Sequence, residues 1–233
     1  REGVFPAPSP TRPGVLICTR QYAIVSGIGE CSGKAAEVAR KPVREERKKQ
    51  IFRALDQCLL EKSFQQTSIK DISRLAGVNH GVLHYYFTSK EDVLLQYIDY
   101  VVEDFKSQMQ ELMSSENVSR MSQRDFIKEV FRFVNDRITL NRDLSKIFIE
   151  IWEIGVHNEA VRDKLRNTYL EWTQTLARNI AGGSTDSETA SIMSIAMVAF
   201  WEGMALFSTI FRNGEIRLEE VLGRFQQRIL EIL

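Results

Sequence analysis

Residues 67–90, TSIKDISRLAGVNHGVLHYYFTSK, have the pattern of two short helices joined by a glycine turn. Ser68, with Asp71 three residues later, is typical of a helix N-cap with an acidic variant of the capping box. Gly77 can take the left-handed conformation that ends a helix, and Asn79 can cap the next one. The stretch therefore predicts a helix-turn-helix, whose second helix enters the major groove of DNA in proteins that read base sequence.

The two faces of the second helix differ in character. Val78, Leu83 and Phe87 recur at intervals of about four residues and can hold this helix against the first. Two histidines and two adjacent tyrosines are an unusual choice for a face that is only solvated. The positions left to be divided between solvent and a partner are His80, Gly81, Val82, His84, Tyr85 and Tyr86.

Residues 44–100 resemble the DNA-binding domain of the TetR family of bacterial transcriptional regulators. Four positions depart from the family's common residues, because Ser63 replaces a glycine, His80 a lysine, Val82 a threonine and His84 a tyrosine. Fold and class survive these changes, but the identity of the base contacts does not carry over. The signature positions that stand in order here are Phe64, Thr67, Ser68, Ile72, Ala76, Gly77, Val78, Gly81, Leu83, Tyr86, Phe87, Ser89, Lys90, Glu91 and Leu94.

The resemblance implies roles for individual residues on double-stranded DNA. Ser68, Tyr86 and Lys90 match the family's phosphate-contact positions, and Thr67 is a further candidate. A histidine can donate to or accept from a base edge, a valine can pack on a thymine methyl group, and a glycine permits close approach. For each single residue, helix packing or solvation is the competing interpretation. The positions that match the base-reading ones are His80, Gly81, Val82, His84 and Tyr85.

Charge is unevenly distributed along the 233 residues, although the net charge is zero. Residues 41–90 hold ten Lys or Arg and five Asp or Glu, a net +5, whereas residues 91–233 hold sixteen and twenty-three, a net −7. A basic head on an acidic body fits a protein of which one end meets phosphate. Ordinary surface charge is the alternative explanation. A supporting helix of the head is expected over residues 44–62, and the basic residues at its start either reach phosphates or are ordinary solvated charges.

The first 42 residues are expected to form a flexible or vector-derived arm, because four prolines between Pro6 and Pro13 oppose helix formation. Arg12, Arg20 and Arg40 could alternatively touch the DNA backbone. The three cysteines lack metal-ligand spacing and suit a reducing cytoplasm. No apolar run was expected to reach the roughly 18 residues of a membrane span, so neither a membrane partner nor a metal is predicted.

Residues 91–233 have helical periodicity, so the chain is expected to be all-α. We expect an arm at 1–42, a three-helix DNA-binding head at 43–90 and a helical ligand-binding and dimerisation body at 91–233. A long helix from Lys90 to about Met113 would link the head to the body. The stretch 190–211 is apolar on most sides, so one side is expected to meet a second subunit. In the TetR family the last two helices form the dimer interface, which here implies Phe200, Phe207, Phe211, Leu222, Phe225 and Ile229.

The aromatic and methionine residues of the body are candidates for a small-molecule effector pocket, with plain core packing as the alternative. Trp152 before a short break and the run 201–204 (WEGM) also resemble the regulatory domain of the betaine/choline-type repressor branch. Tryptophans near Glu150, Glu153 or Glu202 would suit a cationic or amphipathic ligand, although an apolar or anionic one stays open. The candidates are Tyr97, Val101, Phe105, Phe148, Trp152, His157, Trp172, Met193, Met197, Trp201 and Met204.

Enzyme activity finds little support in the sequence. None of the three histidines pairs with a cysteine at catalytic or ligand spacing, and no glycine-rich phosphate loop is present. Glu150, Glu153 and Glu202 could be general acid or base groups, but salt bridges or ligand contacts explain these glutamates more simply. The sequence thus predicts a homodimeric repressor without a cofactor, which binds a palindromic operator and is released by a small molecule. A helical adaptor and an activator without a ligand are the alternatives.

Overall fold

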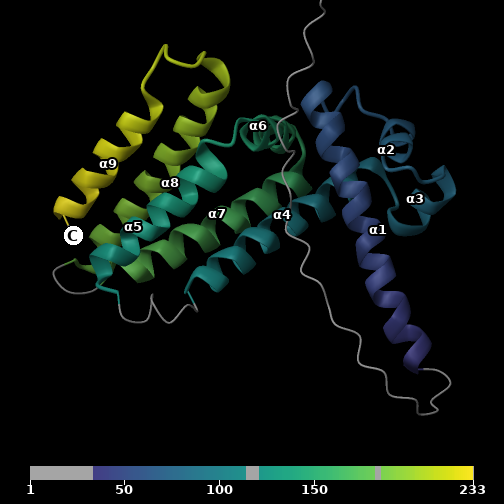
Figure 1. Cartoon of the computed structure of the whole chain (residues 1–233), viewed down its shortest axis with the longest axis horizontal. Coiled ribbons are helices and arrows are strands. Elements are labelled where there is room, and N and C mark those ends of the chain that lie inside the picture. The colour runs from purple at the N-terminus through teal and green to yellow at the C-terminus, as the bar shows by residue number, and fades with distance from the viewer. Residues whose placement is uncertain (1–33, 114–120, 182–184, 233) are drawn as a thin grey trace, which may run out of the picture. The chain divides into compact units, whose positions relative to one another are not determined.

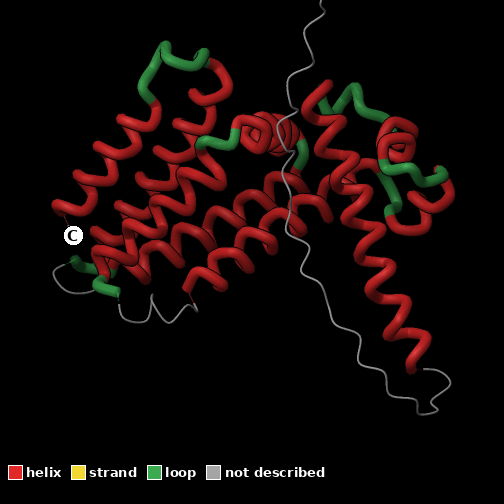
Figure 2. Tube along the Cα trace, viewed as in Figure 1, coloured by secondary structure: helices red, strands yellow, loops and turns green. Residues whose placement is uncertain are grey.

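The computed structural model describes residues 34–113, 121–181 and 185–232. Within these ranges the regular elements are helices, without a strand, so the all-α prediction is confirmed (Figure 2). The helices in order (Figure 1) are α1 Lys34–Glu61, α2 Ile69–Leu75, α3 His80–Tyr86, α4 Lys90–Met113, α5 Gln123–Val134, the π-helical segment η2 Asn135–Thr139, α6 Arg142–His157, α7 Glu159–Ile180, α8 Ser187–Ile210 and α9 Leu218–Ile232.

The turn between α2 and α3 is built as its sequence predicts. The Ser68 hydroxyl accepts from the backbone N–H of Asp71 at 3.2 Å, and the Asp71 carboxylate accepts from the Ser68 N–H at 3.0 Å, which completes the capping box. Asn79 caps α3 by accepting from the N–H of Val82 at 2.8 Å. Gly77 has a φ of +62°, in the left-handed region that favours glycine. Local sequence therefore fixes the angle between these two helices.

Helix α1 begins at Lys34, ten residues before the Arg44 at which periodicity predicted it, and contains Pro42. Arg12 and Arg20 of the expected arm lie outside the described residues, and Arg40 falls within α1. Residues 42–233 form one compact unit. The division of this unit at residue 90 is a functional boundary that we retain as a proposal.

The core of the helix-turn-helix continues into the body. Leu55, Leu83 and Phe87 are fully or almost fully buried in one cluster with Ile147 and Ile151 of α6. Each fully buried aliphatic or aromatic side chain of this kind contributes about 1.5–3 kcal/mol. The head is therefore packed on α6 as well as joined to the body through α4.

Helices α6 and α7 pack closely because a glycine lies between them. The sequence predicts a helix break within residues 155–158, and the break falls at Asn158, which ends α6 and caps α7, while α6 continues through Gly155 to His157. A Cβ atom at residue 155 would lie 2.8 Å from Cδ1 of Leu165. The glycine thus serves helix contact and not helix termination.

A second core cluster joins α5, α7, α8 and α9, and Figure 1 shows α9 beside α8 and α5. Met197, Trp201 and Met204 bury one side of α8 in it. The expectation that no apolar run reaches membrane-spanning length was wrong, since α8 has an 18-residue window with a mean hydropathy of 1.6. The core helix of a soluble protein meets the same test.

Candidate nucleic-acid interface and ligand cavity

Helix α3 presents a continuous exposed face. His80, Gly81, His84 and Tyr85 are exposed, with Tyr85 at 74%, whereas Val82 is half-buried. The rings of His80 and His84 meet edge to face with centroids 4.4 Å apart. Since Leu83 and Phe87 hold the opposite side in the core, the polar and aromatic side chains are free to face another molecule.

The residues that match phosphate-contact positions have different surroundings. Ser68 is exposed at the start of α2, and Tyr86 is half-buried against the core of the head. Thr67 is only 2% exposed, and its hydroxyl donates to the carbonyl of Ser63 at 3.0 Å. Ser68 and Tyr86 are thus accessible to a phosphate, while Thr67 holds the chain before α2.

Lys90 fixes the connection between α1 and α2. Its Nζ donates to the carbonyls of Phe64 at 2.8 Å and Thr67 at 3.0 Å and lies 4.3 Å from the centre of the Phe64 ring. Asp71 is held nearby by an ion pair with Lys62 at 2.7 Å. The hydrogen bonds from Lys62 and Ser68 lower the pKa of Asp71 well below its usual range, so the capping carboxylate stays ionised.

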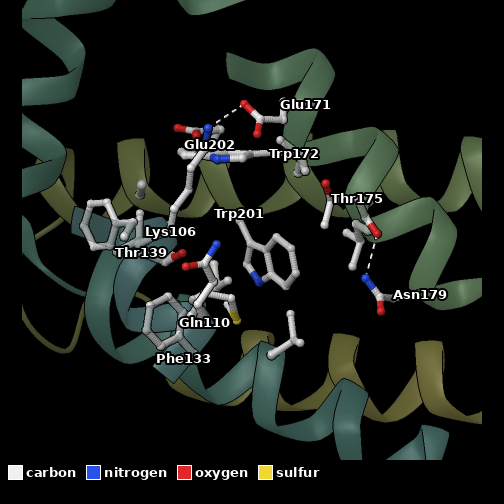
Figure 3. Close-up of a pocket in the computed structure, with 18 of the residues that line it drawn as sticks. Lys106, Gln110, Phe133, Thr139, Glu171, Trp172, Thr175, Asn179, Trp201 and Glu202 are labelled. Atoms are coloured by element: carbon white, nitrogen blue, oxygen red, sulfur yellow. Dashed lines mark hydrogen bonds and ion pairs between the residues drawn. The ribbon is translucent and has the colours of Figure 1, made fainter. Parts of the chain in front are cut away.

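A cavity of about 390 Å³ lies between α4, α5, η2, α7 and α8. Its walls are mostly apolar and include Phe105 from α4. Figure 3 shows Phe133 from α5, Trp172 from α7 and Trp201 from α8 around it. At the rim Lys106 pairs with Glu171 at 2.7 Å. Cavities that bind small molecules are commonly of this size and composition.

Two buried polar atoms that border the cavity have no hydrogen-bond partner among the described residues. They are Oγ1 of Thr139, a residue with no exposed surface, and Nε1 of Trp201, a residue that is 6% exposed. An unpaired buried polar group costs about 1–3 kcal/mol. A ligand with a hydrogen-bond acceptor could remove that cost at the indole N–H.

Glu202 is the half-buried carboxylate of the cavity, whereas Glu171 is exposed. It accepts from the hydroxyl of Tyr169 at 2.9 Å, and that hydroxyl accepts from Nε1 of Trp152 at 2.8 Å. Burial raises the pKa of Glu202, and the hydrogen bond from Tyr169 opposes this rise in part. Burial, then the charge of Glu202, raises the pKa of Tyr169, so its hydroxyl stays protonated and donates.

Glu202 also borders a second cavity of about 520 Å³ between α6, α7 and α8. This groove is lined by Phe148 and Trp152 of α6 and by Ile195 and Leu206 of α8. Trp152, Ile195 and Leu206 are all exposed, which makes the groove open to the surface. Glu202 thus lines both spaces: the one with Phe105, Trp172 and Trp201 in its walls, called the walled cavity below, and the groove.

The sequence-predicted ligand residues divide among several places. Phe105, Trp172 and Trp201 line the walled cavity, and Phe148 and Trp152 line the groove. The other six line neither space: Tyr97 and Val101 lie in the head cluster, Met193, Met197 and Met204 in the second cluster, and His157 is exposed at the end of α6.

The three glutamates considered for chemistry are far from equivalent. Glu150 is half-buried and accepts from the backbone N–H of Phe64 at 3.0 Å, Glu153 is exposed, and Glu202 is half-buried and accepts from the hydroxyl of Tyr169. The sequence missed several lining residues. Phe126, Val130 and Phe133 lie on one side of α5, and their apolar spacing was visible but did not show that this side faces a cavity.

The residues expected at a dimer interface lie mostly in the chain's own core. Phe200 and Phe225 stack on each other with ring centroids 3.8 Å apart, and Leu222 and Ile229 are buried in the second cluster. Phe207 is 44% exposed and contacts Phe211. A different stripe of α8 is apolar and exposed, formed by Ile192, Ile195, Ala196, Ala199, Leu206, Phe207 and Ile210.

Residues 51–97 match the family model of bacterial regulatory proteins of the tetR family. The chain carries a TetR-family DNA-binding domain. This match covers α1 from Ile51, both helices of the helix-turn-helix and the start of α4. Family models of this kind describe DNA-binding transcriptional regulators, and α3 lies within the matched residues. No curated protein matches the sequence.

Solved structures extend the likeness to the body. A TetR transcription regulator from Haloarcula marismortui is 18% identical, with a TM-score of 0.67 over 81% of this chain and 98% of that one. A transcriptional regulator from Saccharomonospora viridis, solved with choline, is 22% identical, with a TM-score of 0.65 over 78% and 96%. The fatty acid degradation regulator FadR from Bacillus halodurans is 18% identical, with a TM-score of 0.62 over 79% and 94%. At these identities the likeness establishes the fold.

Proposed function

We propose that this protein is a homodimeric, cytoplasmic transcriptional repressor without enzyme activity, which binds a palindromic operator and is released by a small cationic molecule. The observation that carries the DNA-binding part is the exposed face of α3 formed by His80, Gly81, His84 and Tyr85. The side chains on this face offer hydrogen bonds and flat apolar contact, which are the means of reading base edges.

The operator can be found by selection from random duplex DNA with the full-length protein, followed by footprinting. Two heads related by a two-fold axis should protect a palindrome whose half-sites face the same side of the duplex. His84→Ala and Tyr85→Ala should alter the sequence preference, each by about 1–3 kcal/mol, while Tyr86→Phe should weaken binding to all sequences alike. A protein that shows no sequence preference after selection would refute the repressor proposal.

We place the dimer contact on the exposed stripe of α8. Gly203 lies within this stripe, and a Cβ atom there would meet nothing within 4 Å, so a second helix can approach closely. Ile195→Glu should give monomers with weakened operator binding, whereas the equally exposed Val43→Glu on α1 should leave the dimer intact. Light scattering tests this, and a monomeric unmodified protein at micromolar concentration would contradict it.

The lining of the walled cavity supports a cationic ligand with an apolar part. It holds two carboxylates, Glu171 and Glu202, and one ammonium, Lys106, which is already paired with Glu171. The aromatic faces of Trp172 and Trp201 add attraction for a positive charge. Neighbours with a similar fold differ in what they are described to do, since one was solved with choline and another is a regulator of fatty acid degradation. The site, and not the fold, therefore carries this proposal.

The ligand class can be tested with choline, with a long-chain quaternary ammonium and with the neutral tert-butyl analogue of choline. We expect the cations to bind and to release operator DNA. Glu202→Gln should weaken cation binding by about tenfold or more, equivalent to about 1.4 kcal/mol, and should leave the neutral analogue unaffected. Equal binding of the charged and neutral probes by the unmodified protein would exclude a cation site at Glu202.

A further inference from the structure

We infer that α6 couples the cavity to the DNA-binding head through two side chains, Lys146 and Glu150, which act as positioning residues. The inference rests on the proposed function, since it names the route by which cavity occupation changes operator affinity. It differs from a route through α4 because α6 reaches the segment between α1 and α2 directly.

The head side of α6 holds two backbone groups. Nζ of Lys146 donates to the carbonyl of Leu60, one of the last carbonyls of α1, which have no partner inside their helix. One turn further along, the carboxylate of Glu150 accepts from the N–H of Phe64 at 3.0 Å. The charges suit their partners, because an ammonium stabilises a helix C-terminus and a carboxylate accepts from an otherwise unpaired N–H.

The anchored segment leads directly into the DNA-binding elements. Phe64 is 5% exposed, and its carbonyl accepts from Lys90 at the start of α4. The next residues are Thr67, which also accepts from Lys90, and Ser68, the N-cap of α2. The start of the helix-turn-helix is therefore held by α4 on one side and by α6 on the other.

A different side of α6 borders the ligand spaces. Ser145, Phe148 and Trp152 line the groove, while Ile147 and Ile151 are buried against the head. Trp152 donates to Tyr169, which donates to Glu202. The same helix is thus hydrogen-bonded toward the cavity carboxylate at Trp152 and toward the head at Glu150.

These contacts give cavity occupation a mechanical consequence. A cation that pairs with Glu202 competes with the hydroxyl of Tyr169 for the carboxylate, and a change at Tyr169 moves its partner on α6. Hydrogen bonds weaken steeply when distance and angle depart from their optimum, so a small shift of α6 would break the contacts of Lys146 and Glu150. The segment before α2 would then lose one of its two anchors. As a result, the head would leave the position in which it binds DNA.

The head end can be tested without an effector, in the full-length protein. Glu150→Ala should speed amide hydrogen exchange in residues 60–68 and weaken operator binding by about 5-fold or more, within the usual range of coupling between sites. Glu150→Gln should behave like the unmodified protein, because its amide oxygen still accepts from Phe64. Glu153→Ala is the matched control on the same helix, where the side chain is exposed, and should change neither quantity.

The cavity end is tested by combining Glu150→Ala with Tyr169→Phe, which removes the hydrogen bond to Glu202. Effects of independent sites on binding free energy add, whereas coupled sites deviate. We expect the double variant to bind the operator with the same affinity as whichever single variant binds it less tightly, because both changes release the same helix.

Two results would overturn the inference: unchanged exchange in residues 60–68 of Glu150→Ala, or operator effects of the two changes that multiply. If the unmodified protein selects no operator, the proposed function fails instead. The exchange comparison between Glu150→Ala and Glu153→Ala still decides whether α6 anchors the head.

Discussion

Asp56→Asn should stabilise the protein at neutral pH and reduce the pH dependence of its stability. Asp56 lies on α1, its carboxylate is largely buried, and it accepts a hydrogen bond from the hydroxyl of Tyr97 on α4. Burial raises the pKa of Asp56 from 3.8 to about 6, although the hydrogen bond from Tyr97 acts in the opposite direction. Asparagine keeps an oxygen that can accept from Tyr97 and carries no charge.

The size and sign follow from the two pKa values. A carboxyl group with a pKa of 3.8 in the unfolded chain and about 6 in the folded one is neutral in both states at low pH and charged in both at high pH. Between these values the folded state holds more protons, so the free energy of unfolding falls as pH rises. At 1.36 kcal/mol per pKa unit, ionised Asp56 costs about 3 kcal/mol above pH 6.

Urea unfolding at fixed protein concentration, at about pH 5 and about pH 7.5, measures this difference. We expect Asp56→Asn to be more stable than the unmodified protein, with the larger gain at the higher pH. Asp163→Asn, at an exposed position of α7, is the control and should leave the pH dependence unchanged. A variant that is less stable at neutral pH would show that ionised Asp56 contributes favourable interactions that outweigh its desolvation.

Three further substitutions test the local structure by thermal or urea unfolding. Asn79→Ala removes the cap of α3 and should cost about 1 kcal/mol, while the same change at exposed Gln65, outside the helices, should cost little. Gly77→Ala should cost about 1 kcal/mol or more because φ is +62° there. Gly155→Ala should cost less than about 1 kcal/mol, because only Cδ1 at the end of the Leu165 side chain must shift and alanine favours a helix interior by roughly 0.5–1 kcal/mol, and a loss of several kcal/mol would show that Leu165 cannot move.

The helix-turn-helix was predictable because its determinants are local. Ser68, Asp71, Gly77 and Asn79 act on backbone groups within three or four residues of themselves, and the structure confirms each of these interactions or conformations. The start of α1 was placed too late, at Arg44 and not Lys34. The residues just before Arg44 gave no clear signal for or against a helix, because differences in helix propensity between ordinary residues are small.

The cavity was only partly predictable, because it depends on which helix sides converge. Aromatic content identified Phe105, Trp172 and Trp201, which the structure places in its walls. The same criterion selected Tyr97, but the hydroxyl of Tyr97 donates a hydrogen bond to Asp56 of α1 and does not line the cavity. Glu150 illustrates the converse case, since nothing local in the sequence indicates that it accepts from a backbone N–H 86 residues away.

Helix α8 shows why apolar composition alone does not select the side on which we propose the subunit contact. Its apolar stretch predicts burial on most sides, but composition does not distinguish the side that packs in the chain's own core from the side that is left exposed. Phe200 stacks on Phe225 within the chain, whereas the exposed stripe is formed by alanines, by aliphatic residues such as Ile195 and by Phe207. Small residues let helices of two subunits approach closely, and aliphatic ones supply the buried area. Phe225→Glu would therefore disturb the core of a single chain, and Ile195→Glu is the change that tests the dimer.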